Sequence, residues 1–283
     1  MNLLNEYQYQ TLDYDGITLN YYDSSEPHVK NDRLPLVIIH GTTGTTDTHF
    51  GYLFPLLASR CRVISVDWSD ILADILELAD LTYQVCAVID LLLGGQKYNL
   101  LGYSLGAVVA AKIAAERNKD VQNLMLVAGW QKTDEQQVLR NHIWTTLRKE
   151  NSEALALYMT FCAFSPNFIR MSPLATHINN SSLIKVNTFI DKQMELNTRI
   201  DITADVPKIL AKTLVIACSQ DQMVPIHHSK QLFAAIDRAS YLEIQSGHGV
   251  VFERPAELFQ HIDHFTADPT AFAEGVILQP RLA

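Results

Sequence analysis

The segment YNLLGYSLG, residues 98–106, carries the strongest structural signal in the chain. A strand is predicted over its first four residues, Tyr98–Leu101, and an alanine-rich helix from Leu105 to about Glu116. A strand, a sharp Gly-X-Ser-X-Gly turn and a helix together are the context of a nucleophile elbow, which lifts a serine hydroxyl clear of the sheet. The helix N-terminus then lies beneath any negative charge that develops there. We therefore favour Ser104 as a nucleophile over the alternative of an incidental serine in a glycine turn.

Short apolar runs alternate with helix-period segments along most of the chain, a pattern that predicts an α/β fold with a parallel sheet and crossover helices. A hairpin from Tyr9 to Tyr22, turning at Asp15-Gly16, precedes this alternation. Helices are predicted over Leu81–Leu93 and from Pro255 onward. The remaining predicted strands are Leu36–Ile39, Val63–Val66, Leu124–Ala128, Leu214–Ala217 and Tyr241–Ile244.

Two loops after later strands supply the groups that a serine nucleophile needs: a base to take its proton and an acid to orient that base. His248 follows the strand ending at Ile244 and is the candidate base. Asp221 follows the strand ending at Ala217 and is the candidate acid. Asp134, after an earlier strand, is the rival acid. The chain order and the nearness of Asp221 to its strand end favour Asp221.

The alternation stops between residues 130 and 205, where the sequence predicts mostly helices, with apolar faces around Leu155–Phe168 and Leu183–Leu196. We expect a helical cap here, inserted into a core domain made of residues 1–129 and 206–283. An apolar lid over a substrate would use residues such as Phe161 and Phe164. Most other apolar side chains of the insertion are expected to pack the cap onto itself.

The composition excludes several classes of function. Of the 283 residues, 48% are hydrophobic, 9% are aromatic and 19% are charged, which is typical of a globular chain with a well-buried core. The net charge is −9, and no local basic stretch could neutralise phosphates, so a nucleic-acid partner is excluded. The longest apolar candidate, Tyr98–Ala115, is interrupted by glycines and by Lys112 and makes a poor membrane span.

The cysteines and the N-terminus favour a reducing compartment. The four cysteines lie in or beside apolar stretches, are widely spaced and form no CxxC pair: Cys61, Cys86, Cys162 and Cys218. The N-terminal MNLLNEYQYQ has neither the basic nor the apolar region of a signal peptide. We therefore expect a cytoplasmic protein with reduced cysteines.

The sequence indicates no metal and no cofactor. His261 and His264 are three residues apart in a predicted helix, but no further ligands accompany them, and we interpret them as part of a solvated face. His227 and His228 are adjacent and are not expected to face one site on a regular helix, so we interpret them as surface or helix-start residues. No HExxH, P-loop or GxGxxG pattern occurs.

Together, these segments resemble an α/β-hydrolase. The matching motifs are the turn at residues 102–106, His40-Gly41-Thr42-Thr43-Gly44 after a predicted strand, the Asp221 loop and the segment from Ser246 to Pro255. The resemblance covers nearly the whole chain except the helical insertion and the tail after Ala267. It implies a mostly parallel eight-stranded sheet with helices on both faces and a cap over the active site. It also implies an oxyanion hole made by the backbone N–H groups of Thr42 and Leu105.

Residues beside these positions are candidates for substrate binding. Thr43 follows Thr42, and Tyr103 precedes the candidate nucleophile. The Thr42 hydroxyl has two interpretations, a hydrogen bond to substrate or one to the local backbone. One departure from the resemblance is the segment Trp68-Ser69-Asp70-Ile71, which stands where many relatives carry a basic, glycine-rich turn. The shape of the pocket rim therefore stays open.

The resemblance and the three candidate residues predict a cofactor-free serine hydrolase. Its substrate would be a small-molecule ester or thioester with an apolar acyl or alcohol part, attacked by Ser104 with help from His248 and Asp221. The same constellation supports C–C bond hydrolysis, lyase chemistry or acyl transfer to an alcohol. A non-catalytic binding protein with this fold is a further alternative, because function belongs to the site and not to the fold. The sequence does not fix the oligomeric state.

Overall fold

The computed structural model describes residues 3–25, 32–181 and 184–278. Within them, eight strands form one sheet in the order β1-β2-β4-β3-β5-β6-β7-β8. Strand β2 pairs antiparallel with both β1 and β4, and the other five pairs are parallel, so the mostly parallel eight-stranded sheet is confirmed. The strands are β1 (Gln10–Tyr14), β2 (Ile17–Asp23), β3 (Leu36–Ile39), β4 (Val63–Asp67), β5 (Tyr98–Tyr103), β6 (Val121–Val127), β7 (Lys212–Cys218) and β8 (Ala239–Ile244).

The strand interiors explain the sequence pattern. Residues of β3 and β5 are buried throughout, which is why β3 is a continuous apolar run and not an alternating one. The polar side chain of Asn99 in β5 accepts a hydrogen bond of 2.8 Å from Asn123 of β6. The predicted hairpin is present, with Tyr14 paired to Ile17 across the turn. Strand β5 extends two residues beyond the prediction because Gly102 and Tyr103 continue to pair with β6.

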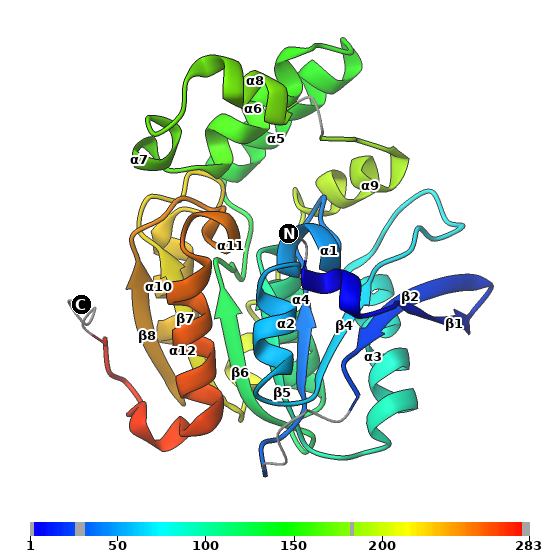
Figure 1. The fold of residues 1–283 in the computed structure, drawn as a ribbon, viewed down its shortest axis with the longest axis vertical. Helices are drawn as coiled ribbons and strands as arrows, with labels where there is room; N and C mark the ends of the chain where they lie inside the picture. Colours follow the sequence, from blue (N-terminus) through cyan, green and yellow to red (C-terminus); the bar gives the residue numbers. More distant parts are fainter. Residues whose placement is uncertain (1–2, 26–31, 182–183, 279–283) are drawn as a thin grey trace.

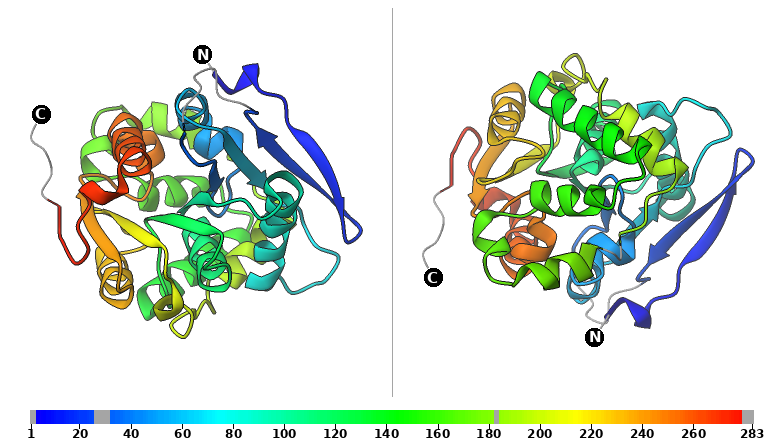
Figure 2. Two further views of the ribbon diagram at one scale, coloured as in Figure 1. Left: turned by 90° about the horizontal axis from the view of Figure 1, so that it is seen from below. Right: turned by 90° about the horizontal axis from the view of Figure 1, so that it is seen from above.

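Helices cover both faces of the sheet, as Figures 1 and 2 show. One face carries α3 (Leu78–Leu93), α4 (Leu105–Glu116) and α10 (Ile226–Ala235). The opposite face carries α1 (Thr46–Phe50), α2 (Leu53–Ala58), α11 (Val250–Glu253) and α12 (Pro255–Ala267). The last helix begins at Pro255 as predicted and buries Leu258, Ile262 and Phe265.

Further helices lie beyond the carboxyl ends of the strands (Figure 1). We call them the upper helices: α5 (Glu135–Lys149), α6 (Ala154–Ala163), α7 (Pro166–Ile169), α8 (Leu174–Ser181) and α9 (Thr188–Leu196). Three of them, α5, α6 and α9, share a small apolar core of Trp144, Leu155, Ile190 and Met194. Leu183, where the second predicted apolar face begins, lies outside the described residues. Three short 3-10 helices span Leu3–Glu6, Val206–Lys208 and Pro269–Ala271.

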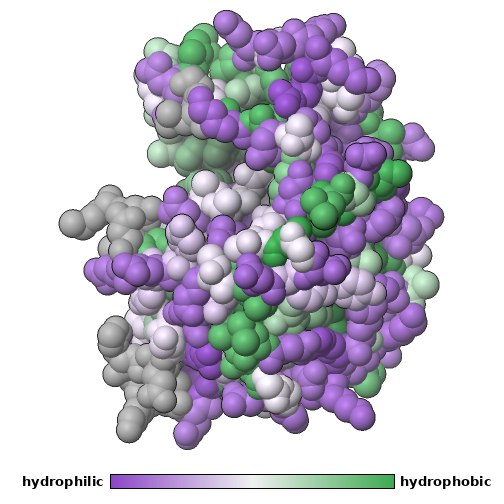
Figure 3. Space-filling model, turned by 90° about the vertical axis from the view of Figure 1, so that its right-hand side faces the viewer, coloured by the Kyte–Doolittle hydropathy of each residue, from purple (hydrophilic) through white to green (hydrophobic). Residues whose placement is uncertain are grey.

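The surface is mostly polar. Figure 3 shows one face of the molecule as largely hydrophilic, with hydrophobic side chains gathered in small separate patches. The four cysteines are free, and Cys61, Cys162 and Cys218 are buried. In the part of the chain that the structure describes, no helix is both long and apolar enough to cross a membrane.

Candidate active site

Ser104 lies on the sharp turn between β5 and α4, in a backbone conformation that favours glycine. Its φ is 57° and its ψ is −124°. The glycines on either side are required by close backbone approach: a Cβ on Gly102 would lie 2.1 Å from the Gly106 carbonyl oxygen, and one on Gly106 would lie 2.2 Å from the Ile39 carbonyl oxygen. The backbones of β5, α4 and the end of β3 therefore pack closely at this turn, and Ser104 is held in a strained backbone conformation.

The structure brings the three candidate residues Ser104, His248 and Asp221 together. Ser104 Oγ lies 2.8 Å from His248 Nε2, and His248 Nδ1 lies 2.7 Å from Asp221 Oδ2. The other Asp221 oxygen accepts hydrogen bonds of 2.8 Å from the backbone N–H groups of Met223 and Val224. All three candidate side chains are nearly buried. With its Nδ1 proton directed at Asp221, the imidazole can accept the serine proton at Nε2.

The rival acid, Asp134, is placed elsewhere. It caps the N-terminus of α5, and its Oδ2 lies 2.8 Å from His227 Nε2 and 3.2 Å from His228 Nε2. The expectation that these histidines would not face one site is therefore wrong. Both lie in the first turn of α10, as the helix-start interpretation predicted, and His227 is exposed while His228 is buried. Their rings are tilted by 34° to each other with centroids 4.2 Å apart, and both reach the same carboxylate. The three side chains form a group that could hold a metal ion.

The loop after β3 lies directly against Ser104. A Cβ on Gly41 would be 2.8 Å from the Ser104 Cβ. Among the described residues, neither the Thr42 nor the Leu105 backbone N–H has an acceptor, so both are free to bind an oxyanion. The Thr42 hydroxyl accepts a hydrogen bond of 3.0 Å from Asn197, just after α9, and not one from the local backbone; a hydrogen bond from this hydroxyl to substrate stays a prediction.

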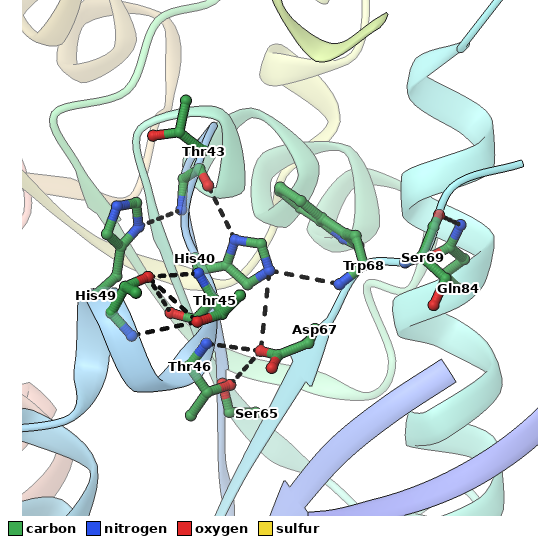
Figure 4. Close-up of polar contacts among 12 residues, drawn as sticks. His40, Thr43, Thr45, Thr46, His49, Ser65, Asp67, Trp68, Ser69 and Gln84 are labelled. Carbon is green, nitrogen blue, oxygen red and sulfur yellow. Dashed lines mark hydrogen bonds and ion pairs between the residues drawn. The ribbon is translucent and has the colours of Figure 1, made fainter. Parts of the chain in front are cut away.

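A buried polar network supports this loop from below (Figure 4). His40 Nδ1 lies 2.9 Å from the Gly41 carbonyl oxygen, and its Nε2 accepts from the Trp68 N–H at 3.4 Å. On the other side, His49 Nδ1 accepts from the Gly41 N–H at 3.1 Å. Burial is the main reason that the pKa of His40 is lowered, and burial with repulsion from other imidazoles lowers the pKa of His49 to about 3. Both rings are therefore neutral, as an acceptor nitrogen requires.

Glu253, to which the sequence analysis gave no role, joins the histidine loop to the upper helices. Its Oε1 accepts from the backbone N–H groups of Gly247 at 3.0 Å and Ser165 at 2.8 Å. Its Oε2 accepts from the Ser165 hydroxyl at 2.6 Å. The Gly249 N–H also donates to the Ala163 carbonyl at 2.8 Å. The loop that carries His248 is thus attached on both sides to the segment linking α6 and α7.

The four candidates for substrate binding have different surroundings. Tyr103 is buried, and its hydroxyl donates to the His248 carbonyl at 2.8 Å. The backbone N–H of Thr43 donates to Gln193 at 3.2 Å. Phe164 stacks on Phe168 and lies against Gly249, whereas Phe161 is 61% exposed. Substrate contact by these four residues stays a prediction.

The unusual turn after β4 contacts the last upper helix. Trp68 packs on His40, with ring centroids 4.4 Å apart. Ser69 exchanges two backbone hydrogen bonds of 2.9 Å with the Gln84 side chain. Asp70 pairs with Lys192 of α9 at 2.8 Å. The acidic residue that replaces a basic turn therefore serves as an attachment point for α9.

The fold and the site together define the class of this protein. A mostly parallel sheet covered on both faces, with a Gly-X-Ser-X-Gly turn after a central strand and a histidine after the last strand, is the α/β-hydrolase architecture. A model described as the alpha/beta hydrolase family matches residues 36–261, and the chain belongs to that family.

Individual relatives agree with this assignment. The chain is 31% identical over 231 residues to pyrrolizixenacetamide deacetylase of Xenorhabdus hominickii, a match that covers 78% of this chain and 86% of the relative. An α/β-hydrolase from a Medee basin deep-sea metagenome library superposes with a TM-score of 0.80 at 18% identity, over 91% of this chain and 97% of the other. The enol-lactonase of Burkholderia xenovorans LB400 superposes with a TM-score of 0.76 at 19% identity, over 91% of this chain and 100% of the other. At these identities, the two solved structures show the fold alone.

Proposed function

We propose that this protein is a serine hydrolase that cleaves an ester or thioester with an apolar acyl or alcohol part. The observation that carries the proposal is the unbroken line of short contacts from Ser104 through His248 to Asp221. A serine hydroxyl is a weak nucleophile until a base takes its proton, and this arrangement supplies an oriented base. The relative named a deacetylase supports the removal of an acyl group.

The reaction would proceed through an acyl-enzyme. Ser104 Oγ attacks the carbonyl carbon as His248 Nε2 takes its proton, and Asp221 stabilises the imidazolium without accepting a proton. The N–H groups of Thr42 and Leu105 hold the oxyanion, with about 3 kcal/mol of transition-state stabilisation from each donor. His248 then protonates the leaving alcohol or thiol. Water attacks the acyl-enzyme with the same base, which releases the acid and restores Ser104.

We further propose that the upper helices act as a cap over this site, in a cytoplasmic protein with reduced cysteines. The attachment of the α6–α7 segment to the loop that carries His248 supports the cap. The wide spacing of the cysteines supports the reducing compartment.

A second candidate is amide hydrolysis by the same residues. It is favoured by one observation, the name of the 31% identical relative, which specifies deacetylation of an acetamide. The same acyl-enzyme would form, with His248 protonating a leaving amine. Parallel assays with a p-nitrophenyl acetate and a p-nitroacetanilide would separate the two candidates.

The proposal is tested by labelling with a fluorophosphonate probe and measuring intact mass. We expect one adduct on the wild type, mapped to Ser104, and none on Ser104→Ala or His248→Ala. Turnover of p-nitrophenyl esters and acyl thioesters should be lost in the same variants. A folded wild type that stays unlabelled and hydrolyses neither class of substrate would refute the proposal.

A further inference from the structure

Three buried N–H donors on helix α5 have no acceptor among the described residues. They are Arg140 Nε, Asn141 Nδ2 and Trp144 Nε1. Residues three and four positions apart share a face of a helix, so Trp144 lies on the same side as Arg140 and Asn141. A buried donor without a partner is costly, and several on one helix face require an explanation. One explanation is a ligand whose oxygens accept hydrogen bonds from these donors.

The charge of Arg140 strengthens this point. Among the described residues, no carboxylate lies within 4.0 Å of its guanidinium, and its one side-chain hydrogen bond is a contact of 3.3 Å with Asn141 Oδ1. That contact uses the amide oxygen of Asn141 and leaves the amide nitrogen free. Arg148, eight residues further along the same helix, is by contrast paired with Asp191 at 2.9 Å. Arg140 as a whole is half-buried, with its Nε fully buried, and a partly desolvated cation without a counter-ion is stabilised when a ligand supplies the anion.

The contacts of α5 place Arg140 beside the proposed active site. The Tyr158 hydroxyl of α6 donates to the Arg140 carbonyl at 3.2 Å, and α6 ends at Ala163, whose carbonyl accepts from Gly249, next to His248. The N-terminus of α5 is capped by Asp134, whose carboxylate contacts His227 of α10. Helix α10 follows the loop that carries Asp221. Figure 1 shows α5 and α6 above the carboxyl ends of the strands. Burial lowers the pKa of Arg140, and the nearby charge of Asp221 acts in the opposite direction.

Asp221 itself is not the missing partner. One of its oxygens accepts two backbone N–H groups, and the other faces His248 Nδ1. The guanidinium is therefore left for a group that enters from outside the chain. A planar guanidinium fork matches a carboxylate in geometry as well as in charge.

We propose that Arg140, together with the Asn141 amide nitrogen, binds a carboxylate of the substrate. This inference rests on the proposed function and narrows it: the hydrolysed ester carries an acidic group at the far end of its acyl part. The apolar part of the substrate would lie between that carboxylate and the carbonyl attacked by Ser104.

A matched pair of substrates tests the inference. The first is mono-p-nitrophenyl adipate, whose second carboxyl is free, and the second is the same compound with that carboxyl blocked as a methyl ester. Wild type should hydrolyse the free acid with a higher kcat/KM than the blocked ester. Arg140→Leu should lose at least about 30-fold in kcat/KM on the free acid, mainly through KM, and change less than about 3-fold on the blocked ester. Arg148→Leu, on the same helix, is the control and should change neither.

A second readout does not depend on turnover. Millimolar adipate should raise the Tm of wild type and of Arg148→Leu but not that of Arg140→Leu. Without ligand, Arg140→Leu should melt no lower than wild type, because it removes a buried Nε donor that has no acceptor and a half-buried charge that has no counter-ion.

The outcomes separate this inference from the proposed function. If wild type prefers the blocked ester, or if Arg140→Leu slows both esters equally, the carboxylate site is refuted while the serine hydrolase stands. If wild type takes no fluorophosphonate label and hydrolyses neither ester, the proposed function is refuted. The adipate-dependent Tm then decides the carboxylate site alone: a shift specific to Arg140 supports it, and its absence overturns it.

Discussion

Removing the Glu253 carboxylate should loosen the loop that carries the proposed base. Glu253→Ala leaves the N–H groups of Gly247 and Ser165 without their acceptor, and Ser165 is only 2% exposed. Each buried unpaired donor costs about 1–3 kcal/mol, and because Glu253 is only half-buried, water can satisfy part of the loss. We therefore expect a loss of about 2–3 kcal/mol in the free energy of unfolding. Glu253→Gln keeps an oxygen for both N–H groups and should lose about 1 kcal/mol or less.

The kinetic effect should follow the same order. His248 adjoins Gly247, and a displacement of about 1 Å in a reacting group can cost about 100-fold in rate. Glu253→Ala should therefore lower kcat on a p-nitrophenyl ester by at least about 10-fold, with Glu253→Gln close to wild type. Urea unfolding monitored by tryptophan fluorescence gives the free energy of unfolding. The rate of fluorophosphonate labelling measures how well His248 activates Ser104. If Glu253→Ala is as stable and active as wild type, the attachment does not order the loop. If the glutamine variant is equally damaged, the charge matters and the hydrogen-bond geometry does not.

Three further predictions concern the turn and the loop beside it. Ser104→Gly should unfold at higher urea than Ser104→Ala, by about 1 kcal/mol, because only glycine relieves the backbone strain; equal stability would show that the turn is unstrained. Gly106→Ala should lose about 3 kcal/mol or more in urea unfolding, because its Cβ would meet the Ile39 carbonyl oxygen; wild-type stability would contradict this close approach. The pKa of His49 falls from 6.5 unfolded to about 3 folded, so the unfolded state binds the extra proton and stability should fall as pH drops from about 6.5 toward 3. His49→Gln, whose amide oxygen can accept from the Gly41 N–H, should flatten that fall in a pH series of melting curves, and an unchanged slope would exclude His49 as its cause.

The candidate site was predictable where each residue follows a strand directly. Ser104, Asp221 and His248 each come at the carboxyl end of a strand in one parallel sheet, and such ends meet at the same edge. Local patterns were enough for the strands as well, because a strand buried on both faces is a short continuous apolar run. The bounds shifted where pairing with a neighbour extends a strand, as at Gly102 and Tyr103.

The contacts made by the upper helices could not be predicted in this way. Glu253 and Ser165 are 88 residues apart, and Thr43 and Gln193 are 150 apart. Helical periodicity shows which face of a helix is apolar, but not where the helix docks. The convergence of His227 and His228 was missed for a related reason: it depends on Asp134, 93 residues away from His227, and not on the helix that carries both histidines.

The positions of these long-range contacts bear on how substrate could enter. The upper helices touch the loops of the proposed site at three places: Ser165 on the histidine loop, Gln193 on the loop after β3, and Lys192 on the turn after β4. Ser165 and Gln193 are buried, so their hydrogen bonds are costly to break, whereas the partly exposed ion pair of Lys192 can be replaced by water at modest cost. The upper helices have a small apolar core of their own, but α9 also contributes Leu196 to the core on the sheet face that carries α3 and α4, with Phe189 packed against it. A movement of α9 would therefore expose apolar surface and release the loop carrying Thr42, so the hydrophobic contact holds α9 in place. We expect the site to be fully ordered only when the upper helices are seated on it.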